Sequence, residues 1–197
     1  HRRSVSVCAA VFSIFRVSYL SQELAVQSIN RFRMSLMASA VLALAGVSFI
    51  GPADAGALQQ KTITIGGVQR TYYVSTPPNY PNRFRKYSVM FVLHGGSGTG
   101  PKVAQTSDMV AQADRLGFIA VFPNSNGGKP WNDGRSSTSM NGNDVAFLVA
   151  VSDLLVKEGS AAATRIFVAG VSNGGMMAQR LACDTNRFAA AAAMVAN

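Results

Sequence analysis

A nucleophilic serine is predicted at Ser172, the centre of a G-x-S-x-G pattern over residues 170–174. An apolar, strand-like run precedes this pattern at 165–169, and a helix-forming segment follows it at 175–183. A sharp turn between a strand and a helix lifts the serine oxygen above the sheet edge, and the flanking glycines keep that turn free of clashes. Asn173 opens the helix, so its N–H group points toward the place where an oxyanion forms. The pattern predicts acyl transfer through a covalent acyl-enzyme on Ser172.

A second segment that could do chemistry is HGGSG at 94–98, which directly follows the continuous apolar run SVMFVL at 88–93. Its backbone can supply another hydrogen-bond donor to an oxyanion. We assign this role to the N–H of Gly96 or Ser97, paired with that of Asn173. Two motifs at two strand ends therefore predict one site.

His94 is the only histidine apart from the first residue of the chain. It could be taken for the general base, but a histidine at the strand end of an HGG loop more often shapes that loop. We therefore expect a structural role for His94, with contact to the substrate as the alternative.

The glycine-rich stretch HGGSGTGPK at 94–102 does not fit a nucleotide site. A phosphate loop needs Gly-Lys-Ser/Thr after four intervening residues, whereas Gly100 is followed by Pro101, Lys102 and a valine. Pro101 also stands where a dinucleotide-binding pattern has its third glycine. We expect no cofactor and no metal.

The elements that must position these motifs alternate along the chain. A hairpin is predicted from strand-like segments around a Gly-Gly turn, and the buried run at 88–93 is typical of a central strand covered on both faces. The predicted strands are 62–65, 68–74, 88–93, 118–122 and 165–169, and the predicted helices are 108–116, 144–157 and 175–183. The alanine-rich run at 188–195 fits either a strand or a helix. This alternation predicts an α/β fold with a mostly parallel, doubly wound sheet and an N-terminal β-hairpin.

From about residue 62 to its end, the sequence resembles the secreted esterases grouped as poly(3-hydroxybutyrate) depolymerases, feruloyl esterases and acetylxylan esterases. The resemblance rests on four segments: HGGSGTG, WNDGR at 131–135, NDVAFL at 143–148 and GVSNGGMMAQRLACD at 170–184. It implies an α/β-hydrolase with Ser172 as nucleophile and the HGG loop as oxyanion hole. It also implies that Trp131 and Arg135 lie near the active-site mouth, and that an aspartate and a histidine lie on later strand-end loops.

This sequence departs from the family pattern at two places near the site. Residues 136–138 are Ser-Ser-Thr, where many relatives carry paired cysteines, and Asn143 replaces one of two adjacent acids. Asp144 is predicted to be a helix-start residue favoured by the helix dipole rather than a catalytic acid. Trp131 is either a partly buried loop aromatic or a stacking surface for a sugar or phenolic ring.

The end of the chain departs further from the pattern, in which the catalytic acid and histidine follow the serine. No histidine follows Ser172, and Asp184, at the end of the helix that the serine begins, is the only acid after it. A serine hydroxyl without a base is a weak nucleophile at neutral pH. We therefore expect the sheet to be incomplete at the C-terminus, the fragment to be nearly inactive, and the missing acid and base to lie beyond residue 197.

The amino-terminal residues indicate export. Two arginines precede residues 34–55, which contain a short apolar run followed by the small-residue site Ala53-Asp54-Ala55. This is the order of features in a secretory signal peptide. A retained membrane anchor is the alternative, although the run is shorter than a span needs. We predict an upstream segment without functional weight at 1–33, a signal peptide at 34–55 and the N-terminal part of a hydrolase domain at 56–197.

The formal net charge of +9 does not by itself indicate a nucleic-acid partner. The tight basic cluster of residues 83–86 falls in a Pro-rich loop region, and no basic helix face is present. Cys8 and Cys183 lie on opposite sides of the predicted cleavage site, so we expect no disulfide between them and treat Cys183 as a small buried residue or one that awaits another partner.

The sequence thus predicts a secreted serine esterase that hydrolyses a polyester or polysaccharide ester, on the pattern of poly(3-hydroxybutyrate) depolymerases. Feruloyl and acetylxylan esterase activities are the alternatives within this chemistry. A catalytically dead secreted module that binds a polymer surface is the alternative from another class. We expect an ester substrate, no nucleic-acid partner and no stable membrane span, and the oligomeric state is not predicted.

Overall fold

The computed structural model describes residues 57–140 and 142–194. The predicted signal peptide and the upstream segment lie outside the described residues. The strands are β1 (Gln59–Ile65), β2 (Val68–Ser75), β3 (Tyr87–Leu93), β4 (Ile119–Pro123), β5 (Ala161–Val171) and β6 (Ala190–Met194). The helices are α1 (Gly100–Thr106), α2 (Met109–Leu116), α3 (Asp144–Lys157) and α4 (Asn173–Asp184), with a short 3-10 turn at Asn126–Gly128.

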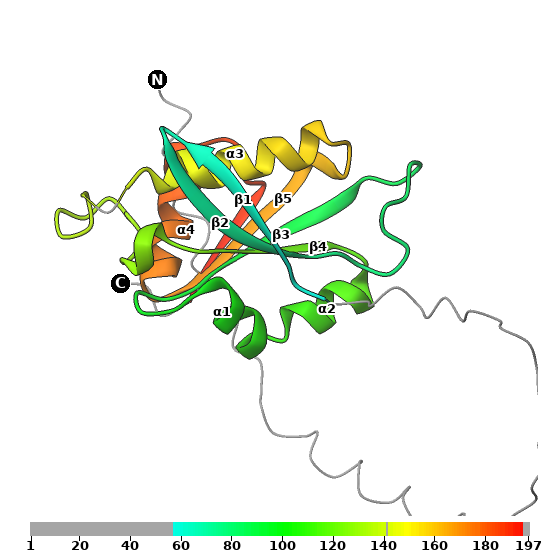
Figure 1. Cartoon of the computed structure of the whole chain (residues 1–197), viewed down its shortest axis with the longest axis horizontal. Coiled ribbons are helices and arrows are strands. Elements are labelled where there is room, and N and C mark those ends of the chain that lie inside the picture. The colour runs from blue at the N-terminus through cyan, green and yellow to red at the C-terminus, as the bar shows by residue number, and fades with distance from the viewer. Residues whose placement is uncertain (1–56, 141, 195–197) are drawn as a thin grey trace, which may run out of the picture.

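One six-stranded sheet runs in the order β1-β2-β4-β3-β5-β6. The pairs β4–β3, β3–β5 and β5–β6 are parallel. All five residues of β4 are buried, as expected of a strand covered on both faces. In Figure 1, α3 lies on one side of this sheet and α1 and α2 lie on the other. The predicted doubly wound α/β arrangement is confirmed.

Two apolar cores fill the spaces between the sheet and its helices. The larger core joins β3 and β5 to α3 and α4 through side chains such as Phe91, Phe147 and Leu181. The smaller core joins the opposite face of the sheet to α1 and α2, around Phe122 and Ala113. Because right-handed crossovers send successive helices to opposite faces when the strand order reverses, this division follows from the topology.

The predicted N-terminal hairpin is confirmed. β1 and β2 pair antiparallel around the turn at Gly66 and Gly67, and β2 continues the sheet by pairing antiparallel with β4. Arg70 is a buried charged residue on this hairpin, with 4% of its surface exposed. The hairpin thus extends the parallel sheet and brings one arginine toward its carboxyl-terminal edge.

Two elements differ from the sequence-based expectation. α1 was not predicted, yet Thr99 caps it by accepting a hydrogen bond from the N–H of Lys102 at 3.3 Å, and a proline occupies its first turn. The alanine-rich run forms β6 rather than a helix, and it pairs parallel with β5 from Phe167 to Val171. Alanine favours a helix intrinsically, so the open edge of β5 decides this structure.

Cys183 lies close to the end of α4. It is exposed and disulfide-bonded, so the first of the two expectations for it, a small buried residue, is wrong. Cys8, with which no pairing was expected, lies outside the described residues.

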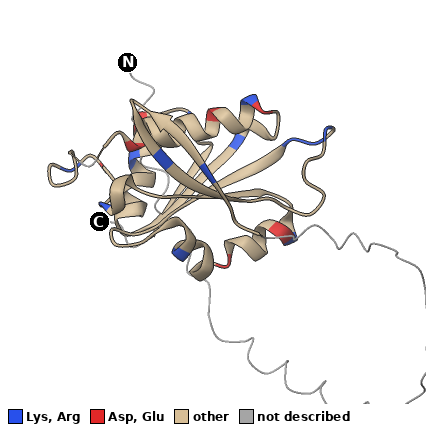
Figure 2. Cartoon of the chain, in the orientation of Figure 1, with Lys and Arg blue, Asp and Glu red and all other residues tan. Residues whose placement is uncertain are grey.

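Over the part of the chain that the structure describes, no helix has the length and apolar character to span a membrane. Figure 2 shows lysine and arginine spread over several elements rather than along one helix.

Candidate active site

The turn between β5 and α4 holds Ser172 in a conformation that non-glycine residues seldom adopt. Its φ is 53° and its ψ is −125°, and its side chain is exposed at the carboxyl end of β5. The Ser172 N–H donates to the carbonyl of Met194 at 2.8 Å, and the Ser172 carbonyl accepts from the N–H of Met176 at 3.0 Å. A residue persists in such a conformation only when its surroundings fix it, as these bonds do on both sides.

Two glycines let this turn fit against the sheet. A Cβ on Gly174 would lie 2.6 Å from the Leu93 carbonyl oxygen and closer still to that of His94. A Cβ on Gly170 would collide with the carbonyl of Gly174. The G-x-S-x-G spacing is therefore required by close backbone contact between the start of α4 and the ends of β3 and β5.

The HGG loop lies beside this turn, as the two motifs predicted. A Cβ on Gly95 would be 3.7 Å from the Ser172 Cβ, and one on Gly96 would be 3.8 Å from the Asn173 Cβ. Asn173 is the first residue of α4, so its N–H has no partner within the helix. The structure thus brings together Ser172, Gly96 and the first N–H of α4, while Ser97 follows on the exposed part of the loop.

His94 is fully engaged with the backbone and is only 2% exposed. Its Nδ1 lies 2.6 Å from the Gly95 carbonyl oxygen, and its Nε2 accepts from the Ser125 N–H at 3.2 Å. The proton therefore resides on Nδ1, which donates to Gly95. Burial lowers the pKa of His94, while the hydrogen bond to Gly95 and the charge of Asp144 oppose this effect. His94 shapes the loop, and neither ring nitrogen is left for a base or for substrate contact.

Trp131 is completely buried, so it offers no stacking surface to a ring that arrives from solvent. Its indole packs on the His94 ring with centroids 4.8 Å apart and planes at 37°. The indole N–H donates to the His94 carbonyl at 2.9 Å. Trp131 therefore belongs to the support of the HGG loop rather than to the mouth of the site.

The side chain of Asn173 binds the loop that contains Trp131 and Asp133. Its Oδ1 accepts from the Trp131 N–H at 2.6 Å, and its Nδ2 donates to the Trp131 carbonyl at 3.1 Å and to Asp133 Oδ2 at 2.6 Å. Sequence reasoning assigned only the backbone of Asn173 and did not single out Asp133. Asp133 lies within the family-like segment WNDGR, which was the available signal.

Asp133 also holds Arg135 and Thr138. Its carboxylate, which has no exposed surface, accepts hydrogen bonds from the Arg135 guanidinium at 2.7 Å and from the Thr138 hydroxyl at 2.7 Å. Burial alone raises the pKa of Asp133, but hydrogen bonds from Arg135, Thr138 and Asn173 outweigh it and lower the pKa to about 2. Arg135 lies half exposed beside the site with its charge already paired.

The ionised Asp133 is expected to give acid sensitivity to the fold. A pKa of about 2 in the folded state lies below the value of 3.8 for a free carboxyl, so the contribution of Asp133 to stability is complete above pH 4. That contribution is lost as the pH falls through 2. Urea unfolding between pH 5 and 2 should show the difference between the wild type and Asp133→Asn shrink toward pH 2. A difference that is independent of pH would contradict this.

Asp144 forms a buried ion pair with Arg70 in addition to starting α3. The Arg70 guanidinium lies 2.5 Å from Asp144 Oδ1 and 4.2 Å from the centre of the Phe147 ring. Asp144 Oδ2 also accepts from the Asn132 N–H at 2.7 Å. The expected helix-start role was thus incomplete, since the capping bond of α3 comes from Asn143, which accepts from the N–H of Ala146. Asp144 joins the hairpin to the loop beside Asn173.

A general base is not found among the described residues. His94 is their only histidine, and Asp184 lies at the far end of α4, where it accepts from Arg180 Nε at 3.0 Å. Within residues 57–140 and 142–194, no group of three or more metal-ligating side chains gathers at one place. This part of the chain places Ser172 beside the backbone of the HGG loop and the first N–H of α4.

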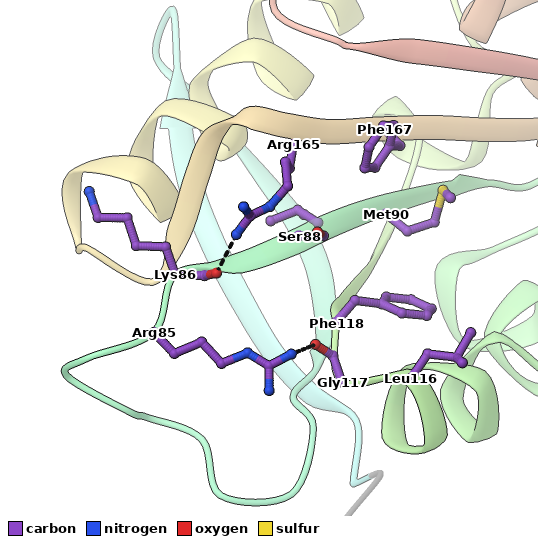
Figure 3. Close-up of a pocket in the computed structure, with 10 residues that line it drawn as sticks. Arg85, Lys86, Ser88, Met90, Leu116, Gly117, Phe118, Arg165 and Phe167 are labelled. Atoms are coloured by element: carbon purple, nitrogen blue, oxygen red, sulfur yellow. Dashed lines mark hydrogen bonds between the residues drawn. The ribbon is translucent and has the colours of Figure 1, made fainter.

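A cavity in the lower part of the sheet does not include Ser172 among its lining residues. This cavity of about 360 Å³ is lined by the first half of β3, the residues before β4 and Arg165 and Phe167 of β5. In Figure 3, Arg85 donates to Gly117 and Arg165 donates to Lys86 at its rim. Phe167 precedes Ser172 by five residues, which is roughly 16 Å along an extended strand. A polar cavity of about 290 Å³ lies closer to the site, between the HGG loop and residues 124–128.

Comparison with known proteins supports a hydrolase architecture. The family described as Peptidase_S9, prolyl oligopeptidase family, matches residues 101–197. Feruloyl esterase B of Neurospora crassa is 34% identical over 100 residues, which are 49% of this chain and 34% of that protein. The putative esterase NocK of Nocardia uniformis subsp. tsuyamanensis is 28% identical over 139 residues, which are 69% of this chain and 40% of that protein. The chain thus spans well under half the length of these curated relatives.

Solved structures identify the fold. Acetyl xylan esterase from Aspergillus awamori matches with a TM-score of 0.56 at 23% identity, over 68% of this chain and 50% of that chain. The chain has the α/β-hydrolase fold. In α/β-hydrolases the nucleophile occupies the turn after a central strand, which is the place of Ser172 after β5.

Proposed function

We propose that this protein is a serine esterase that cleaves carboxylic esters through an acyl-enzyme on Ser172. The observation that carries the proposal is an exposed serine at positive φ, with the first N–H of α4 and the Gly95-Gly96 loop beside it. Relatives with 34% and 28% identity are an esterase and a putative esterase, which supports the same chemistry.

The proposed reaction follows from this geometry. Ser172 Oγ attacks the ester carbonyl carbon, and the carbonyl oxygen becomes an oxyanion that accepts hydrogen bonds from the N–H of Asn173 and of Gly96 or Ser97. The bond to the alcohol then breaks, and the alcohol leaves with a proton. Water attacks the acyl group, releases the acid and restores the serine hydroxyl. The base that moves these protons is not among the described residues.

The proposed substrate is an ester carried by a polymer. The names of the similar proteins, feruloyl esterase and acetyl xylan esterase, favour a polysaccharide ester, while a polyester such as poly(3-hydroxybutyrate) agrees with the resemblance of the sequence motifs. Export through a signal peptide at 34–55 is part of the proposal, because a polymer too large to enter a cell must be met outside it. A catalytically dead polymer-binding module is the competing function.

A fluorophosphonate probe tests the proposal on the protein expressed from its full reading frame. We expect one covalent adduct, which peptide mass spectrometry should place on Ser172, together with hydrolysis of at least one of methyl ferulate, acetylated xylan and poly(3-hydroxybutyrate). The relative rates then assign the substrate class. Polymer binding without an adduct or hydrolysis would support the binding module instead.

A further inference from the structure

We propose that Asn173 and Trp131 are positioning residues that fix the two halves of the oxyanion hole relative to each other. This inference rests on the proposed esterase function, because it assigns a task to side chains that never reach the substrate. The two donors come from different elements, one from the loop after β3 and the other from the start of α4. The two elements touch directly where Gly174 packs on the end of β3, and the loop 131–133 adds a second connection because it contacts both of them.

The first part of the connection is the Asn173 side chain. Its amide uses its carbonyl oxygen and both N–H groups in bonds of 2.6, 3.1 and 2.6 Å to Trp131 and Asp133. An asparagine amide has few other ways to form hydrogen bonds, so its orientation is determined. The backbone N–H of the same residue is the proposed oxyanion donor. Movement of the side chain therefore turns the first peptide of α4.

The second part of the connection is the Trp131 indole. It donates to the carbonyl of His94 and packs on the His94 ring, whose Nδ1 donates to Gly95. The backbone of Trp131 binds α4, while its side chain binds the start of the HGG loop. One residue thus touches both halves of the proposed oxyanion hole.

The loop itself is anchored to α3 and α4, and β2 supports it indirectly through Asp144. Asp144 of α3 accepts from the Asn132 N–H, and Arg180 of α4 donates to the Asn132 carbonyl and side chain at 2.8 and 2.7 Å. Arg70 of β2 pairs with Asp144 behind it. The supporting bonds are buried or partly buried, where hydrogen bonds to charged groups are strong.

Catalytic rates respond to small displacements of the reacting groups, so the effect of Asn173 and Trp131 on the oxyanion donors can be measured. An oxyanion donor acts only when it lies about 3 Å from the developing charge, and a 1 Å displacement can lower the rate by about 100-fold. When a donor moves away, the stabilisation of the transition state falls more than the binding of the substrate. The expected signature is a fall in kcat with an unchanged KM.

The test compares Asn173→Ala and Asn173→Asp with the wild type, all expressed from the full reading frame, using a soluble ester and a trifluoromethyl ketone inhibitor. For Asn173→Ala we expect kcat to fall about 10- to 100-fold with KM within about twofold, and inhibitor affinity to fall in parallel with kcat. Asn173→Asp should fall further, because it sets a second carboxylate against Asp133. Ser136→Ala, an exposed change in the same loop, serves as the control and should match the wild type.

A second variant separates positioning from folding. Trp131→Phe keeps a ring against His94 but removes the indole N–H, and we expect about a tenfold fall in kcat with KM unchanged. If a folded Asn173→Ala or Trp131→Phe protein keeps kcat within about twofold of the wild type, the positioning role is overturned. A rise in KM in both variants, with kcat unchanged, would also overturn it. A wild type that neither hydrolyses esters nor takes the fluorophosphonate label instead overturns the proposed function itself.

Discussion

Ser172→Ala should lower ester hydrolysis by about 10⁴-fold or more, with the residual rate supplied by the oxyanion donors and by substrate binding. The reason is that no other described side chain at the carboxyl end of β5 can take over the covalent step. Fluorophosphonate labelling should disappear in the same variant. The measurements are kcat/KM on a soluble ester and intact-protein mass spectrometry after incubation with the probe.

The companion variant Ser172→Gly links this activity to stability. It should be as inactive as the alanine variant, but its urea unfolding free energy should rise by about 1 kcal/mol, because glycine adopts a φ of 53° without steric strain. Ser172→Ala retains a Cβ and should not gain this stability. An active Ser172→Gly protein, or one less stable than the alanine variant, would show that the turn is not strained around a nucleophile.

Arg70→Met is expected to cause the largest loss of stability, about 3–5 kcal/mol in urea unfolding. The substitution leaves the Asp144 carboxylate buried at 1% exposure without its cationic partner, although methionine can still pack on Phe147. Removal of one member of a buried pair is expensive because the other charge cannot return to water.

Two further variants make this prediction specific to the buried pair. Replacement of both members, Arg70→Met with Asp144→Leu, should recover part of the loss, because no uncompensated charge then remains. Arg187→Ala, which breaks an exposed bridge to Asp153, should change stability by less than about 1 kcal/mol. Equal effects of the buried and the exposed substitutions would contradict the account of this network.

Much of the fold could be predicted because its signals are local. α3 begins and ends at the predicted residues, Asp144 and Lys157, since Asn143 caps it and apolar residues recur along one face. The run that forms β3 has no polar alternation, which distinguishes a central strand. β6 was undecided because the preference of alanine for a helix competes with a long-range pairing that no local pattern records.

The candidate site divides in the same way. Ser172 and the HGG loop follow from short motifs, and their neighbourhood follows from the rule that carboxyl ends of parallel strands share one edge. The contacts Asn173–Asp133 and Arg70–Asp144 join residues 40 and 74 positions apart, so no spacing in the sequence pairs them. The family resemblance implies that Trp131 lies near the active-site mouth, whereas in the structure its ring is completely buried.

The bond from the Ser172 N–H to the carbonyl of Met194 relates the proposed nucleophile to the order in which the chain is synthesised. Residue 194 belongs to the last described strand, so the serine turn acquires this bond only after β6 has been made and has paired with β5. A nascent chain that ends before β6 contains the serine but lacks one of the two backbone bonds that hold it. The conformation of the turn at Ser172 is therefore completed only after β6 has joined the sheet, later than the translation of Ser172 itself.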